Sequence, residues 1–113
     1  MKVQKRKTKN GAVKQALKLL SDKEHWCQGS SAKDKKGYST VVDDPNSYQF
    51  CASGALQAVC EGEALYHDVY RCVNKVCIAK HHAGMVTIND GKNQDVAHER
   101  IIEVFTEAIK VCK

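Results

Sequence analysis

The sequence of 113 residues has one proline, one tryptophan and no long apolar run. No stretch approaches the roughly 20 apolar residues of a membrane-spanning helix, and no hydrophobic region follows the basic first residues as it would in a secretory signal. Internal repeats and low-complexity segments are also missing, which argues against solenoids and disordered chains. We therefore expect one small cytoplasmic domain without a membrane partner.

Several common enzyme motifs are missing as well. The chain has no glycine-rich loop that would cradle phosphate, no serine nucleophile motif and no pair of carboxylates at catalytic spacing. The sequence therefore favours a protein that is not an enzyme, and it predicts no cofactor.

The positive charge is concentrated at the start of the chain. Seven basic residues precede the first acidic residue, Asp22, whereas the rest holds eleven basic and thirteen acidic residues. We predict a flexible basic arm over residues 1–9 and a single helical domain over residues 10–113. Such an arm either neutralises the phosphates of a nucleic acid or is a solvated tail. The candidates for nucleic-acid contacts are Lys2, Lys5, Arg6, Lys7 and Lys9.

Four segments have the apolar spacing of helices and predict an all-α domain of about four helices. They cover residues 10–22, 44–60, 63–80 and about 94–113. Residues 25–38 lack a period and predict one long ordered loop, which the ring of Trp26 holds to the core. Residues 39–42 are expected to form an extended connection, and residues 85–88 a short apolar stretch across one end of the domain.

The segment 44–60 is predicted to be the central helix. Asp44 is a good N-cap, and Pro45 suits the first helical position. Small residues follow from Ala52 to Ala55, with Gly54 among them, and they allow another element to approach the backbone closely.

The six cysteines are predicted to be free thiols, mostly buried in the core, because a reducing cytoplasm disfavours disulfides. One alternative is a zinc site, because its possible ligands are spaced as Cys-x4-Cys-x3-His. These ligands are Cys72, Cys77 and either His81 or His82. Cys72 and Cys77 lie about 140° apart around a helix, however, so they would not chelate one ion easily. No metal site is predicted.

Cys51 is the sharpest enzymatic candidate. A nucleophilic thiol needs a helix N-terminus or an imidazole beside it. Asn89 or Asp90 could orient the base, and the candidate bases are His25, His67, His81, His82 and His98. Cys51 would lie about two turns inside the predicted central helix, on its apolar face. Core packing is therefore the favoured interpretation.

Asn89 and Asp90 are a further candidate site. One hypothesis places them in a binding pocket together with Trp26, Gln28 and Asp34. The favoured alternative is an Asx-type turn that leads into the last helix.

Short motifs between Trp26 and Ile109 resemble those of a family of small bacterial and phage proteins of unknown function. The matching residues are Trp26, Gln28, Gly29, Ala32, Asp34, Cys51, Gly54, Ala55, Leu56, Asn89, Asp90, Phe105, Ala108 and Ile109. The resemblance implies a compact, mostly helical domain in a phage or mobile-element setting, and no activity.

The preferred functional hypothesis is a non-enzymatic binding or regulatory protein that contacts a host macromolecule, either a protein or a nucleic acid. The first alternative is a small cysteine-dependent hydrolase or transferase that uses Cys51 with a histidine. The second is nucleic-acid binding through the basic arm. The oligomeric state is left open.

Overall fold

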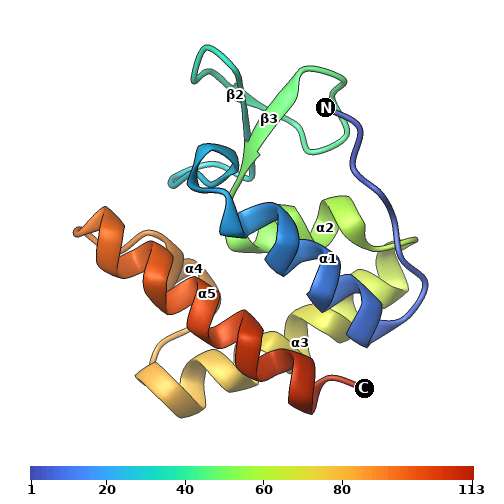
Figure 1. Cartoon of the computed structure of the whole chain (residues 1–113), viewed down its shortest axis with the longest axis vertical. Coiled ribbons are helices and arrows are strands. Elements are labelled where there is room, and N and C mark those ends of the chain that lie inside the picture. The colour runs from blue at the N-terminus through green and yellow to red at the C-terminus, as the bar shows by residue number, and fades with distance from the viewer.

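The structure, a computed structural model, describes residues 1–113 and contains five α-helices and a small sheet (Figure 1). The helices are α1 (Lys9–Ser21), α2 (Ala52–Val59), α3 (Glu63–His81), α4 (Met85–Asn89) and α5 (Gln94–Val111), with a 3-10 turn η1 (Lys23–His25) after α1. The strands are β1 (Ala32–Asp34), β2 (Ser39–Thr40) and β3 (Ser47–Phe50). The domain is therefore α+β, and the all-α prediction is wrong.

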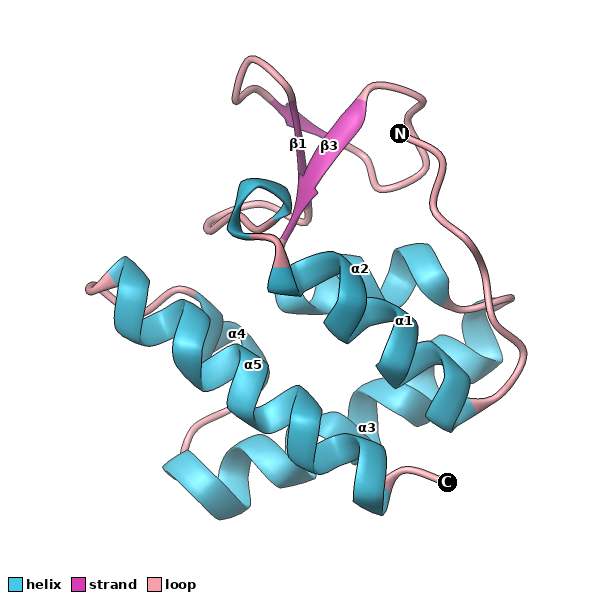
Figure 2. Cartoon of the chain, viewed as in Figure 1, coloured by secondary structure: helices cyan, strands magenta, loops and turns pink.

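The sheet stands at one end of the molecule, above the helices in the view of Figure 2. Its order is β2-β1-β3 with antiparallel pairs, and Ala32 of β1 lies opposite Thr40 on one side and Phe50 on the other. Asp34 and Gly37, the latter with a φ of +90°, form the turn between β1 and β2. The predicted long loop and extended connection thus contain two short strands.

The predicted central helix begins later than its sequence suggests. Residues Ser47–Phe50 form β3, and α2 starts at Ala52 with Cys51 as its N-cap. Asp44 instead closes a turn, in which its side chain accepts a hydrogen bond from Asn46 N at 2.7 Å. Both ends of β3 are buried, with 1% and 0% of their surface exposed. Burial and pairing with β1 therefore override the helical spacing, and the predicted cap at Asp44 is wrong.

The other three predicted helices lie close to their expected bounds. The side chain of Thr8 caps α1 by accepting from Gly11 N at 3.0 Å, and Asn93 caps α5 by accepting from Val96 N at 3.2 Å. α1 packs against both α2 and α5, and the apolar faces of the helices form one core (Figure 1). None of the helices combines the length and the apolar character that crossing a membrane requires.

The basic segment before α1 runs along the outside of the molecule, from the sheet to the start of α1 (Figure 1). Arg6 N donates to Val59 O at 2.6 Å, and Arg6 O accepts from Glu61 N at 2.9 Å. Lys5 Nζ donates to Ala58 O at 3.1 Å. These bonds attach the segment to the connection between α2 and α3.

Cys72 of α3 and Cys112 at the end of α5 form a disulfide, with their Cα atoms 6.0 Å apart. The prediction of six free thiols is wrong for this pair, because it rested on an expected compartment and not on where the helices place the two side chains. Cys60 and Cys77 are free and buried, as predicted, and Cys27 of the loop before β1 is free and buried as well. Burial raises the pKa of Cys60, Cys77 and Cys27 to about 11, about 11 and about 12, respectively.

Candidate functional site

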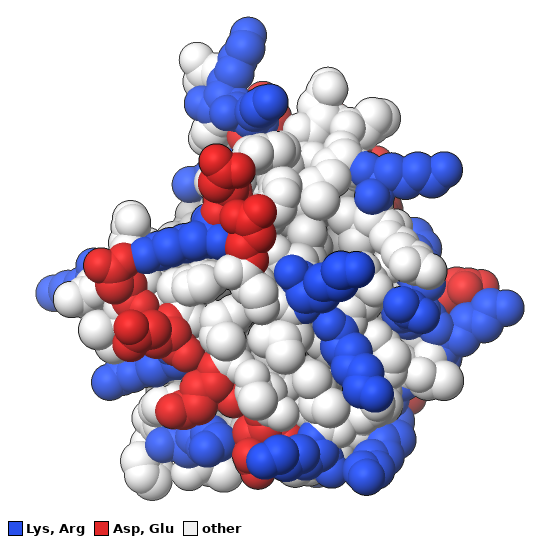
Figure 3. All heavy atoms as spheres, in the orientation of Figure 1, with Lys and Arg blue, Asp and Glu red and all other residues white.

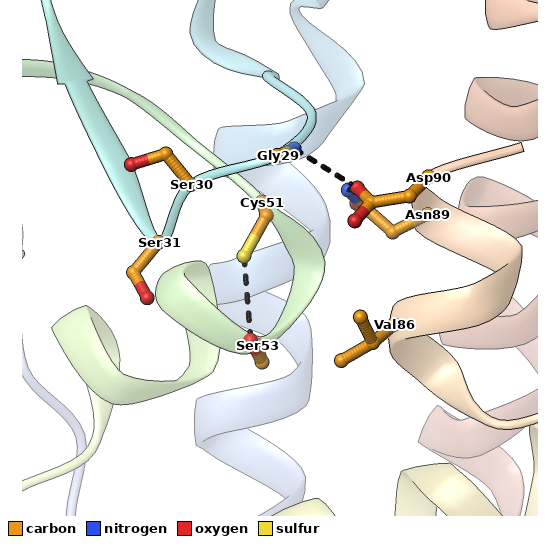
Figure 4. Close-up of a pocket in the computed structure, with 8 residues that line it drawn as sticks. All are labelled: Gly29, Ser30, Ser31, Cys51, Ser53, Val86, Asn89 and Asp90. Atoms are coloured by element: carbon orange, nitrogen blue, oxygen red, sulfur yellow. Dashed lines mark hydrogen bonds between the residues drawn. The ribbon is translucent and has the colours of Figure 1, made fainter. Parts of the chain in front are cut away.

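A pocket of about 220 Å³ lies where the loop before β1, the N-terminus of α2 and the end of α4 meet (Figure 4). Its lining residues are Gly29, Ser30, Ser31, Cys51, Ser53, Val86, Asn89 and Asp90. The fold thus brings the candidate nucleophile Cys51 to the same pocket as Asn89 and Asp90, which the catalytic hypothesis had combined with it, but without a histidine.

Asn89 is the residue that joins the walls of this pocket. It is 2% exposed, and all four hydrogen-bonding positions of its carboxamide are used. Its Oδ1 accepts from Trp26 Nε1 at 2.8 Å and from Ala52 N at 2.9 Å. Its Nδ2 donates to Cys27 O at 3.1 Å and to Asp90 Oδ1 at 3.0 Å. One buried side chain therefore fixes three segments relative to one another.

The loop and the turn after α4 are also joined by hydrogen bonds in both directions. Gln28 Nε2 donates to Asn89 O at 2.9 Å and to Gly91 O at 2.8 Å. Gly29 N donates to Asp90 Oδ1 at 3.1 Å. The Asn89 side chain accepts nothing from the residues that follow it, so it does not form the favoured Asx-type turn, and Asn93 caps the last helix instead.

Four of the five predicted binding residues lie together at this junction. They are Trp26, Gln28, Asn89 and Asp90. Asp34 lies apart from them, since its Oδ1 accepts from Lys36 N and Tyr38 N at 2.9 Å in the turn between β1 and β2. Asp34 therefore serves that turn.

Cys51 is half-buried at the N-cap of α2. Its Sγ accepts from Gly54 N at 3.3 Å and lies 3.3 Å from Ser53 Oγ, toward which it points in Figure 4. The sequence argument against a reactive Cys51 placed it two turns inside a helix. That argument rested on the wrong helix start, since the thiol stands at a helix N-terminus and lines a pocket.

Gly54 allows the loop before β1 to lie directly on α2. A Cβ atom at this position would be 1.9 Å from the carbonyl oxygen of Ser31, so no other residue fits without moving the backbone. The same carbonyl accepts from Cys51 N at 3.2 Å. The predicted close approach at these small residues is confirmed at Gly54.

The candidate bases lie elsewhere. No histidine lines the pocket with Cys51. His67 is exposed on α3 beside the ring of Tyr66, and His81 Nε2 is 2.9 Å from Glu103 Oε1 of α5. The structure therefore does not bring Cys51 into one pocket with any of the predicted bases.

The residues of the zinc hypothesis are also separated by the fold. The disulfide takes Cys72 out of the pattern, and Cys77 is buried in the core. No group of three or more His, Cys, Asp or Glu side chains is arranged to hold a metal ion.

Charge is distributed unevenly over the face shown in Figure 3. Basic side chains gather over α1 and the segment before it, whereas acidic side chains form a row along α5. Among the predicted nucleic-acid residues, Lys5 contacts the end of α2 through its amine, and Arg6 donates to Gln15 Oε1 at 3.1 Å. Lys2 and Lys7 are exposed, and Lys9 is half-buried at the start of α1.

Comparison with known proteins gives one match. Residues 5–111 match the profile of a family described as a family of unknown function (DUF6197). No curated protein and no solved structure matches the chain significantly. The resemblance to an uncharacterised family is confirmed, and it brings no activity with it.

Proposed function

The chain belongs to this family of unknown function, and we propose that it is a non-enzymatic binding protein that contacts a macromolecule of its host through the pocket beside Asp90. The observation that carries the proposal is the Asn89 network, which holds three walls of the pocket in place. Catalysis by Cys51 would require a base within hydrogen-bond reach, whereas the thiol pairs only with Ser53 Oγ and Gly54 N and no histidine lines the pocket. The phage or mobile-element setting is part of the proposal.

The size of the pocket supports a macromolecular partner. Its volume of about 220 Å³ is below the roughly 300–1,000 Å³ of pockets that hold small molecules and cofactors. A single side chain inserted from a partner is a more suitable occupant. Val86 lies on the wall with 52% of its surface exposed, and it offers the apolar contact that anchors such a side chain.

Photo-crosslinking in the host tests the proposal. We expect a photoreactive phenylalanine analogue at Val86 to give a discrete adduct with one partner. The same analogue at Val41, which is 69% exposed near the sheet, is the matched control and should give none. Equal adduct patterns at both positions, or no adduct at Val86, would contradict binding at the pocket.

A cysteine-dependent hydrolase or transferase is the second candidate, and the position of Cys51 at the N-cap of α2 favours it. Such an enzyme would turn over acyl or peptide substrates and would lose this activity in Cys51→Ser. If purified protein shows turnover that depends on Cys51, the enzymatic function replaces the binding function.

Nucleic-acid binding is the third candidate, and the basic side chains over α1 and the preceding segment favour it (Figure 3). Its signature is an affinity that falls as the salt concentration rises. On a DNA duplex, the logarithm of the association constant falls with the logarithm of the salt concentration, with a slope of about −0.9 per phosphate neutralised. Replacing Lys2 and Lys7 by glutamine should reduce that slope. These substitutions are preferable to deletion, because the backbone of Arg6 attaches the segment to the fold.

A cytoplasmic location accompanies the proposal, and the disulfide is the observation that opposes it, since disulfides are rare in reducing compartments. Alkylation of unfolded protein taken directly from cells decides the matter. Six modified thiols would agree with the cytoplasm, and four would indicate an oxidising compartment.

A further inference from the structure

The carboxylate of Asp90 is the one charged group in the pocket. We propose that it is the counter-ion for an alkylammonium group, such as the one at the end of a lysine side chain, and that this group is what enters the pocket. The inference rests on the proposed binding function and names the chemistry of the group that is bound.

Asp90 is held rigidly by the protein. Its Oδ1 accepts from Gly29 N at 3.1 Å and from Asn89 Nδ2 at 3.0 Å, and its own N–H donates to Val86 O at 2.9 Å. In Figure 4 the carboxylate points across the pocket toward the wall formed by Gly29 and Cys51. A carboxylate fixed in this way loses little conformational freedom when a ligand binds.

The second oxygen of Asp90 remains open. Oδ2 forms no hydrogen bond with the protein, and none of the ion pairs in the structure includes Asp90. None of the eight lining residues is a lysine, an arginine or a histidine. The pocket is thus locally negative on a chain whose net charge is +5, and it attracts a cation.

An anion is the less suitable occupant, although the N-terminus of α2 forms one wall. Two of the N–H groups there are already bonded, because Ala52 N donates to Asn89 Oδ1 at 2.9 Å and Gly54 N donates to Cys51 Sγ at 3.3 Å. Asp90 would also repel an anion. Internal acceptors have therefore taken two of the donors that an anion would need.

The open carboxylate oxygen favours an ammonium over a guanidinium group. A guanidinium forms its strongest pair with two oxygens of one carboxylate, and Oδ1 of Asp90 already accepts two bonds. An ammonium donates three bonds in separate directions, and the pocket supplies Ser53 Oγ as a further acceptor. Val86 provides an aliphatic surface for the methylene groups.

Titration with small amines, followed by the amide NMR signals of Gly29, Ser53 and Asp90, tests this assignment. We expect saturable shifts with n-butylammonium and with Nα-acetyl-lysine methylamide, weaker ones with butylguanidinium, and none with n-butanol. Glycine methylamide, which carries only an α-amine, distinguishes a chain terminus from a lysine side chain. Binding of glycine methylamide alone would overturn the lysine assignment.

Asp90→Asn is the decisive variant, because the asparagine oxygen still accepts from Gly29 N and Asn89 Nδ2 while the charge is removed. Affinity for n-butylammonium should fall roughly fivefold or more. Asp44→Asn removes the same charge from a turn outside the pocket and should have no effect. Unchanged affinity in Asp90→Asn, or equal shifts with n-butanol, would overturn the proposal.

The crosslinking experiment separates the two proposals. A Val86 adduct of undiminished yield in Asp90→Asn would leave the binding function in place and overturn the ammonium assignment. Binding of n-butylammonium without any partner adduct at Val86 would leave the assignment in place and overturn the binding function.

Discussion

The network around Asn89 predicts a large loss of stability on replacement by alanine. Asn89→Ala removes the oxygen to which Trp26 Nε1 and Ala52 N donate their hydrogen bonds. It also removes the amide nitrogen that donates to Cys27 O. All three partner groups belong to buried residues. The variant therefore leaves polar groups unsatisfied in the core without relieving any strain.

The size of the effect follows from the two buried donors that lose their acceptor, Trp26 Nε1 and Ala52 N. Each buried donor without a partner costs about 1–3 kcal/mol, and water that enters from the pocket offsets part of this. We expect the free energy of unfolding to fall by about 3 kcal/mol. For a domain of this size that corresponds to a drop of about 10 °C in the melting temperature.

Urea unfolding followed by circular dichroism measures this change, because the signal does not depend on the environment of the single tryptophan. Asn46→Ala is the matched control, since its exposed side chain makes no hydrogen bond in the structure and its loss should change stability by less than about 0.5 kcal/mol. Should Asn89→Ala be as mild as Asn46→Ala, the network would not be what holds the three segments together.

Four further predictions concern the helix contact and the cysteines. Gly54→Ala should destabilise the domain by about 2 kcal/mol or more, because the methyl group would meet Ser31 O at 1.9 Å; a calorimetric melting temperature equal to that of wild type would refute the close contact. Iodoacetamide at pH 8 should modify Cys51 before Cys27, Cys60 and Cys77, whose burial raises their pKa to about 12, about 11 and about 11, and peptide mass spectrometry shows the order. Since those three pKa values lie above the ordinary 9.0, the unfolded chain loses protons first, and the free energy of unfolding should fall as the pH rises above 9. Reduction of the disulfide, which spans 40 residues of sequence, should lower stability by about 4 kcal/mol by the loop-entropy relation; urea curves with and without a phosphine reductant test this, and Cys72→Ala, which has no disulfide to reduce, should give the same curve in both.

The long helices α1, α3 and α5 could be predicted from the sequence, because each has several turns of apolar spacing, and α1 and α5 also have a capping side chain. The strands could not, since β1, β2 and β3 have three, two and four residues and give no readable period. The sequence Asp44-Pro45 imitates a helix start, and only the pairing of Phe50 with Ala32 shows that a strand follows it. That pairing is a long-range contact, which local spacing does not encode.

The site was partly predictable for the same reason. Motif resemblance singled out Trp26, Gln28, Asn89 and Asp90, but not the manner in which they meet. Asn89 reaches Ala52 and Trp26 across 37 and 63 residues of sequence. The position of Cys51 at the edge of the pocket depends on β3 ending one residue earlier. Both facts depend on tertiary structure.

The attachment of Arg6 has a consequence for proteolysis. A protease binds its substrate as an extended strand, and the N–H and the carbonyl of Arg6 already pair with the connection after α2. Trypsin must therefore wait for this segment to open locally before it can cut after Arg6. The rate of that cut, compared with the rate at Lys36 in the exposed turn between β1 and β2, would report the free energy of local opening.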